Sequence, residues 1–168
     1  MRFRTKDLVT AAVLIAIGII LPMIIHISGI NGAVFLPMHI PVLLSGLILG
    51  SSLGLIVGII SPMLNHILTG MPPVPIIWIM LVELAVYGLV SGYLYRRVKM
   101  TLMPSLIFSM ILGRISAALT VLVLGAVLSL PMPPLGLYIK GITITALPGI
   151  IIQILLIPSI VRAYEKNR

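Results

Sequence analysis

The sequence predicts an all-α integral membrane protein, a six-transmembrane-helix bundle that forms one membrane domain over residues 1–168. Hydrophobic residues make up 60% of the chain and charged residues only 8%, whereas about a quarter of a soluble domain is charged. Such a composition excludes a soluble enzyme and a disordered tail, and the lack of cysteine excludes a disulfide-stapled secreted module. A helix crosses a bilayer in roughly 20 apolar residues, which places the spans at about 7–26, 34–49, 54–70, 76–95, 101–129 and 141–162.

The first span follows a basic N-terminus, but its apolar run is too long for a signal peptide and lacks a cleavage site in the right place, so we expect a retained helix. The second and third spans are separated only by residues 50–54, which predicts a tight helical hairpin. Small residues recur every fourth position through this turn, a spacing that lets helix backbones approach closely in lipid. They are Gly46, Gly50, Gly54 and Gly58.

The fourth span repeats this spacing at Gly88 and Gly92, and the fifth at Gly113 and Ala117. We interpret these repeats as packing within the chain. The fifth span is longer than a bilayer requires, so it is expected to tilt or to have a broken end.

Basic residues set the orientation of the spans. Nine of them cluster in three segments that six crossings place on one side, which by the positive-inside rule is the cytoplasm. Both termini are therefore expected to be cytoplasmic, and the net charge of +8 indicates insertion and contact with anionic lipid rather than nucleic-acid binding. The nine residues are Arg2, Arg4, Lys6, Arg96, Arg97, Lys99, Arg162, Lys166 and Arg168.

Most prolines fall in the outer loops or outer helix halves of this frame. Proline frees a backbone carbonyl, which is tolerated at membrane depth only beside other protein or a wet cavity. Because four prolines lie inside the expected spans, they predict an outward-facing cavity. These are Pro37, Pro41, Pro62 and Pro148.

Two ionisable residues, Glu83 and Arg114, lie within the expected spans. A charged side chain is costly inside a membrane, so each is a candidate functional residue by default. Counting 1.5 Å per residue places both about 10–12 Å below the outer surface. One interpretation is a structural ion pair between the fourth and fifth spans. The other is that one or both contact a polar ligand, and a pair that lines a cavity could do both.

Further polar and aromatic residues fall in the same layer and are candidate substrate contacts. His39, Asn65 and His66 lie near the outer ends of the second and third spans, where single membrane histidines are also common packing residues. Asn65 and His66 point about 100° apart, so one of them is expected to face inward. Gln153 lies near mid-membrane in the sixth span and is a candidate for the cavity floor.

Three aromatic residues complete the candidate site. Trp78 and Tyr138 lie at interfacial depth, where an aromatic belt explains them as well as contact with a flat ligand does. Tyr87 lies one turn beneath Glu83 and is expected to support it by a hydrogen bond.

Catalysis is poorly supported by the sequence. It has no cysteine nucleophile, no HExxH and no paired carboxylates, so we expect no enzyme activity, no metal and no cofactor. The chain also lacks a GxxxxGK[ST] motif, so any ATP hydrolysis must occur in separate subunits.

The chain resembles the substrate-binding S component of an energy-coupling factor (ECF) vitamin transporter. The likeness is carried by the six spans, by the opening KDLVTAAVLIA with Ala12 and Ala16 spaced as AxxxA, and by the second and third spans, FLPMHIPVLLSGLILG and GLIVGIISPMLNHILTGMPP. The resemblance implies a protein of the prokaryotic cell membrane that captures a vitamin-like small molecule in its outer half. It also implies a transmembrane scaffold subunit, which Ala12 and Ala16 would meet, and two ATPase subunits.

The substrate itself is left open by the sequence. Arg114 could meet a carboxylate and Glu83 a hydroxyl or amine, which favours pantothenate, then pyridoxine. Only three aromatic residues lie in the expected cavity zone, which argues against a large fused-ring ligand such as riboflavin. The alternatives from other classes are a stand-alone secondary transporter or channel for a small polar solute, and an intramembrane enzyme. A coupled transporter would need ion-binding polar residues in two half-repeats, and the sequence shows none.

Overall fold

The computed structural model describes residues 3–29, 32–127 and 129–166, and within these ranges it is helical and has no strand. Arg2 and Arg168 of the basic segments, and Leu128 of the predicted fifth span, lie outside the described residues. Six helical segments are long and apolar enough to cross a membrane, which confirms the predicted fold: Thr5–Ile27, Gly32–Leu49, Ser51–Thr69, Ile76–Arg97, Leu102–Ala126 and Leu147–Lys166.

Three helices form the centre of the bundle. α5 (Ile76–Gly92) packs extensively against both α4 (Ser51–Thr69) and α3 (His39–Leu49). The packing is backbone against backbone: a side chain at Gly88 would overlap the carbonyl of Gly54, and one at Gly54 would overlap the carbonyl of Gly88. The predicted role of the regularly spaced glycines as internal packing positions is therefore confirmed except at Gly50, where a Cβ would meet nothing within 4 Å.

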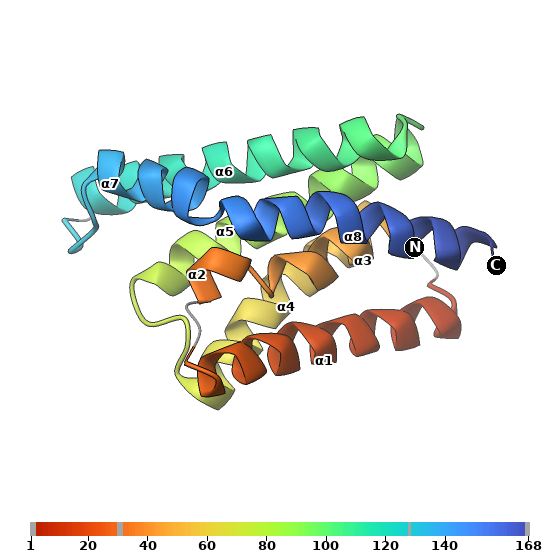
Figure 1. Cartoon of the computed structure of the whole chain (residues 1–168), viewed down its shortest axis with the longest axis horizontal. Helices are drawn as coiled ribbons and strands as arrows, with labels where there is room; N and C mark the ends of the chain where they lie inside the picture. The colour runs from red at the N-terminus through yellow and green to blue at the C-terminus, as the bar shows by residue number, and fades with distance from the viewer. Residues whose placement is uncertain (1–2, 30–31, 128, 167–168) are drawn as a thin grey trace.

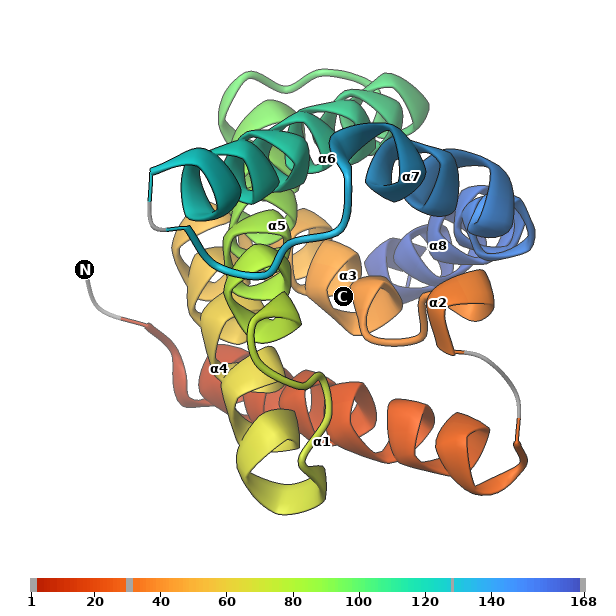
Figure 2. The same cartoon turned by 90° about the vertical axis from the view of Figure 1, so that its left-hand side faces the viewer.

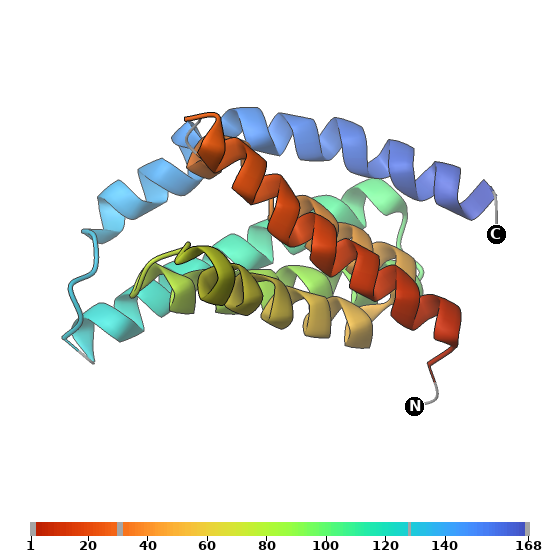
Figure 3. The same cartoon turned by 90° about the horizontal axis from the view of Figure 1, so that it is seen from below.

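The remaining spans cover this centre. α6 (Leu102–Ala126) packs against α5, while α1 (Thr5–Ile27) packs against α3 and α4 on the opposite side, as Figure 2 shows. α8 (Leu147–Lys166) lies against α3 and α6. α1 begins and α8 ends at the same end of the bundle (Figure 1), as an even number of crossings requires. Seen from below, α1 (red) runs obliquely across the inner helices (Figure 3).

The second span is broken, where the sequence predicted one continuous helix over 34–49. α2 (Gly32–Phe35) ends just before Leu36, whose φ of 50° is left-handed, and α3 begins only at His39. The residue before a proline is disfavoured in the α region, and Pro37 follows Leu36 directly. The break makes His39 the first residue of α3, with Pro37 in the loop rather than inside a helix.

The sixth span begins later than the predicted 141–162. Residues upstream form α7 (Leu135–Lys140) and the π-helical turn η2 (Gly141–Thr145), and α8 starts at Leu147. Pro148 has no N–H to bond the carbonyl four residues earlier, so the helix cannot run unbroken through this point. Pro148 consequently lies in the first turn of α8 rather than deep in a span.

Other boundaries differ less from the predictions. α4 starts three residues early, so Gly50 alone, with a φ of 96°, forms the turn after α3. α5 continues into a π-helical turn, η1 (Tyr93–Arg97), and α6 ends at Ala126. From η1, the Arg96 side chain reaches the end of α3, where Nε donates to the Leu47 carbonyl over 2.9 Å and Nη2 donates to the Ile48 carbonyl.

Candidate ligand-binding site

A cavity of about 440 Å³ lies at the end of the bundle opposite to the start of α1. Its walls come from the last turns of α1, from α2 and the break after it, from the α4–α5 loop, and from α7 and η2. The volume falls at the lower end of the range for small-molecule sites. The lining is mainly apolar, with six polar side chains that converge on it: His26, His39, Asn65, Glu83, Tyr138 and Thr145.

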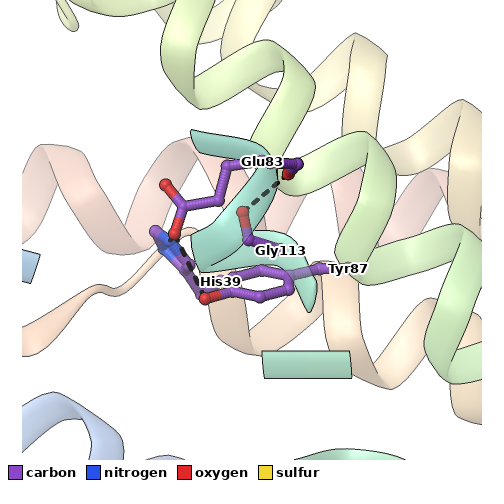
Figure 4. A network of polar contacts seen from close by, with 5 residues as sticks. His39, Glu83, Tyr87 and Gly113 are labelled. Carbon is purple, nitrogen blue, oxygen red and sulfur yellow. Dashed lines mark hydrogen bonds and ion pairs between the residues drawn. The ribbon is translucent and has the colours of Figure 1, made fainter. Parts of the chain in front are cut away.

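Glu83 is held at the inner end of this cavity by two aromatic neighbours (Figure 4). Tyr87, one turn further along α5, donates its hydroxyl to Glu83 Oε1 over 3.1 Å. His39, at the start of α3, brings Nε2 within 3.5 Å of the same oxygen. The His39 and Tyr87 rings meet edge to face with centroids 5.2 Å apart, so each fixes the other's orientation. The predicted hydrogen bond from Tyr87 to Glu83 is confirmed.

Tyr87 is positioned from its far side by α6. A side chain at Gly113 would overlap the Tyr87 ring, so the ring lies directly against the Gly113 backbone. Tyr87 is fully buried and does not line the cavity itself. Its role here is to position Glu83.

The cavity contains buried polar groups with no protein partner. His39 and Asn65 are each 2% exposed and Glu83 is 5% exposed. Neither Asn65 Oδ1 nor His39 Nδ1 has a hydrogen-bond partner among the described residues. A buried polar atom without a partner costs roughly 1–3 kcal/mol, so these atoms favour a polar ligand or solvent in the cavity.

Arg114 differs from its predicted place. Among the described residues, Glu83 has His39 within 3.5 Å and forms no ion pair with Arg114, and Arg114 does not line the cavity. The Arg114 guanidinium is half-buried on α6, and its Nη2 atom is buried without a hydrogen-bond partner in the described chain. The predicted Glu83–Arg114 ion pair is therefore wrong.

Tyr138 lies on α7, outside the six spans, and packs near Ile79, Ala117 and Val121. Burial, followed by the charge of Glu83, raises the pKa of the Tyr138 phenol well above its ordinary value, against an opposing effect of Arg114. The hydroxyl is thus protonated at neutral pH and available to the cavity that it lines.

Three predicted contacts lie away from the cavity lining. His66 Nδ1 is 2.7 Å from the carbonyl of Pro72, so it ties α4 to the loop that follows. Trp78 is 48% exposed on the outer surface of α5. Gln153 is fully buried, and neither of its amide atoms has a hydrogen-bond partner in the described residues.

Sequence reasoning overlooked part of the wall. Neither His26 nor Thr145 is among the predicted contacts, yet both line the cavity. Three methionines, Met38, Met71 and Met80, add flexible apolar surface. The clustering of Met with Pro near the outer ends of the spans was the available signal.

Ala12 and Ala16 lie on the outer side of α1. Both are exposed, whereas Ala11, Leu14 and Gly18 on the opposite face are buried against the bundle. The two alanines therefore form a small-residue stripe on the protein surface. In the described ranges, no three His, Asp or Glu side chains are close enough to hold a metal ion.

Comparison with known families agrees with this architecture. A family described as "ECF transporter, substrate-specific component" matches residues 6–161, nearly the whole chain. Searches among curated proteins and among solved structures found no match. The family and the six apolar helices together indicate a multi-pass membrane protein with a substrate-binding role in transport. The chain belongs to the family of substrate-specific components of ECF transporters.

Proposed function

We propose that this chain is the substrate-capture subunit of an ATP-driven ECF importer for a vitamin or related micronutrient in a prokaryotic cell membrane, and that its cavity binds the substrate. The observation that carries the proposal is the convergence of His39, Asn65 and Glu83, all buried, on one otherwise apolar cavity. With the basic ends in the cytoplasm, this cavity faces outward, as capture requires.

The same proposal assigns partners to the chain. A transmembrane scaffold subunit would dock on the stripe of Ala12 and Ala16, because small exposed residues permit close helix approach in lipid. Two ATPase subunits would supply the energy, since the chain has no phosphate-binding loop of its own.

Among candidate vitamins, the cavity favours pyridoxine over pantothenate. The preference for pantothenate depended on Arg114 as the partner of a carboxylate, and Arg114 is not part of the cavity wall. Pyridoxine offers hydroxyl groups to Glu83 and Asn65, and a flat ring to the Met- and Pro-rich lining.

Native mass spectrometry of the purified chain tests the function. We expect a small molecule to copurify with the wild-type protein and to be lost from Asn65→Ala. It should remain in the control Ser159→Ala, which changes an exposed side chain on α8. Substrate uptake by vesicles that contain this chain alone would contradict the proposal and support a stand-alone transporter.

A further inference from the structure

We propose that the cavity selects a small neutral or cationic solute whose polar end donates hydrogen bonds, and that it rejects carboxylates. This inference rests on the proposed function, because it names the chemical class of the captured substrate. It follows from the charges on the cavity wall and from the hydrogen-bonding atoms left free there.

The charge of the wall is one-sided. Among the described residues that line the cavity, Glu83 is the acidic residue and there is no Lys or Arg. The nearby cations lie outside the lining: Arg114 is on α6, and Lys140 is exposed at the end of α7. Arg114 acts on the wall only from outside it, through its charge on Tyr138. An anionic ligand would lose its hydration next to a carboxylate without a cation on the wall to pair with, which is unfavourable at low dielectric.

Two acceptors at the inner end of the cavity, one on Glu83 and one on Asn65, are left for a ligand. Tyr87 and His39 both approach Oε1 of Glu83, so Oε2 remains for a ligand. Asn65 adds a buried carbonyl oxygen, Oδ1, that has no hydrogen-bond partner within the described ranges. Hydroxyl or ammonium groups on the ligand satisfy both positions, whereas a carboxylate, which only accepts, satisfies neither. The rest of the wall is mainly apolar, so it suits a compact ligand whose remaining surface is largely apolar.

Substituted cysteines measure the charge directly, because the chain has no native cysteine. Thr145→Cys places a single thiol on the cavity wall, and Thr143→Cys places one two residues away in η2 but outside the lining. Both are reacted, in the full-length purified protein, with a cationic (ethyltrimethylammonium) and an anionic (ethylsulfonate) methanethiosulfonate. We expect the cationic-to-anionic rate ratio to be about tenfold higher at Thr145→Cys, as one nearby charge produces at intermediate dielectric.

Glu83→Gln in the Thr145→Cys background should lower that ratio to the Thr143→Cys value. The matched control, Glu165→Gln, removes the same charge at the end of α8, where Glu165 bonds only Tyr95 among the described residues, and should leave the ratio unchanged. Equal ratios at the two cysteines, or a ratio insensitive to Glu83→Gln, would overturn the inference.

Ligand pairs in which a carboxylate replaces one hydroxymethyl group test the selectivity, because this change adds a negative charge and removes a hydrogen-bond donor. Calorimetry with pyridoxine against 4-pyridoxate, and with pantothenol against pantothenate, should give at least about tenfold weaker binding for the carboxylate of any pair that binds. Tighter binding of a carboxylate overturns the charge selection and leaves the capture function intact. Absence of binding by all four compounds counts against these vitamins as substrates in the proposed function, while the labelling ratio still decides the charge of the cavity.

Discussion

The ring of Tyr87 occupies the space that a side chain at residue 113 would need, so its contact with α6 exists only because that residue is Gly113. Neither Tyr87 nor Gly113 lines the cavity, yet their contact fixes the phenol that bonds Glu83. The geometry of the site therefore depends on a helix-packing glycine that touches no ligand.

Replacing this glycine should disturb the site. Gly113→Ala would place a methyl group where the Tyr87 ring lies. The ring must then move, which carries the Tyr87 hydroxyl away from Glu83. We expect a loss of about 1–3 kcal/mol in stability, typical of overpacking, together with weaker ligand binding. Thermal unfolding in detergent and calorimetry measure the two effects.

Gly125→Ala is the matched control on the same helix, because a methyl group there meets only Met132 side-chain atoms at ordinary contact distances of 3.5 and 3.7 Å. It should leave both stability and binding near wild type. Equal effects of the two alanines would show that helix propensity or lipid contact, rather than Tyr87, accounts for the loss.

Double-mutant cycles should distinguish the two candidate partners of Glu83. His39 lies within 3.5 Å of its carboxylate, whereas Arg114 forms no ion pair with it. Glu83→Gln combined with His39→Gln should show a coupling energy of about 0.5–3 kcal/mol in unfolding. Glu83→Gln combined with Arg114→Gln should be nearly additive. A larger coupling with Arg114 would restore the ion pair that the sequence alone suggested.

Bulky residues on the outer face of α1 should separate binding from transport. Ala12→Leu with Ala16→Leu blocks close approach of another helix and touches neither the core nor the cavity. Ligand binding by the isolated protein should be unchanged, while ATP-dependent uptake with the partner subunits falls to background. The exposed pair Ala126→Leu and Ala163→Leu serves as the control. Loss of ligand binding in the α1 variant would contradict the assignment of Ala12 and Ala16 to partner docking alone.

Arg96 should contribute to stability from the end remote from the cavity. Its guanidinium donates to two carbonyls at the end of α3, which have no intrahelical partners. Arg96→Gln is expected to lower the free energy of unfolding by about 1 kcal/mol. The exposed neighbour Arg97→Gln removes the same charge and should have little effect on thermal unfolding. Identical melting curves for the two variants would argue against this capping role.

Composition and apolar run length predicted the six crossings and most boundaries, because a bilayer fixes how many apolar residues a helix needs. The same reasoning missed the break at Leu36 and Pro37 and the late start of α8. Both stretches remain apolar, so hydropathy carries no signal there. Backbone restrictions imposed by proline decide these two boundaries instead.

Depth alone predicted which layer holds the polar residues but not which of them meet. Residue counting predicted similar depths for Glu83 and Arg114, yet Arg114 does not line the cavity and Glu83 has His39 as its neighbour instead. The Tyr87 hydrogen bond was predictable because it lies within one helix at a spacing of four residues. Contacts between helices depend on packing angles that a single sequence does not encode locally.

The backbone contact between Gly54 and Gly88 has a consequence for how substrate preference can change. It leaves no room for side chains to adjust between α4 and α5, so Asn65 and Glu83, which α4 and α5 carry, are fixed in relative position. The wall formed by α7 and η2 has no such constraint at Gly141, which lines the cavity and where a Cβ would meet open space. Specificity can therefore be retuned on that wall by single substitutions, without repacking the inner helices.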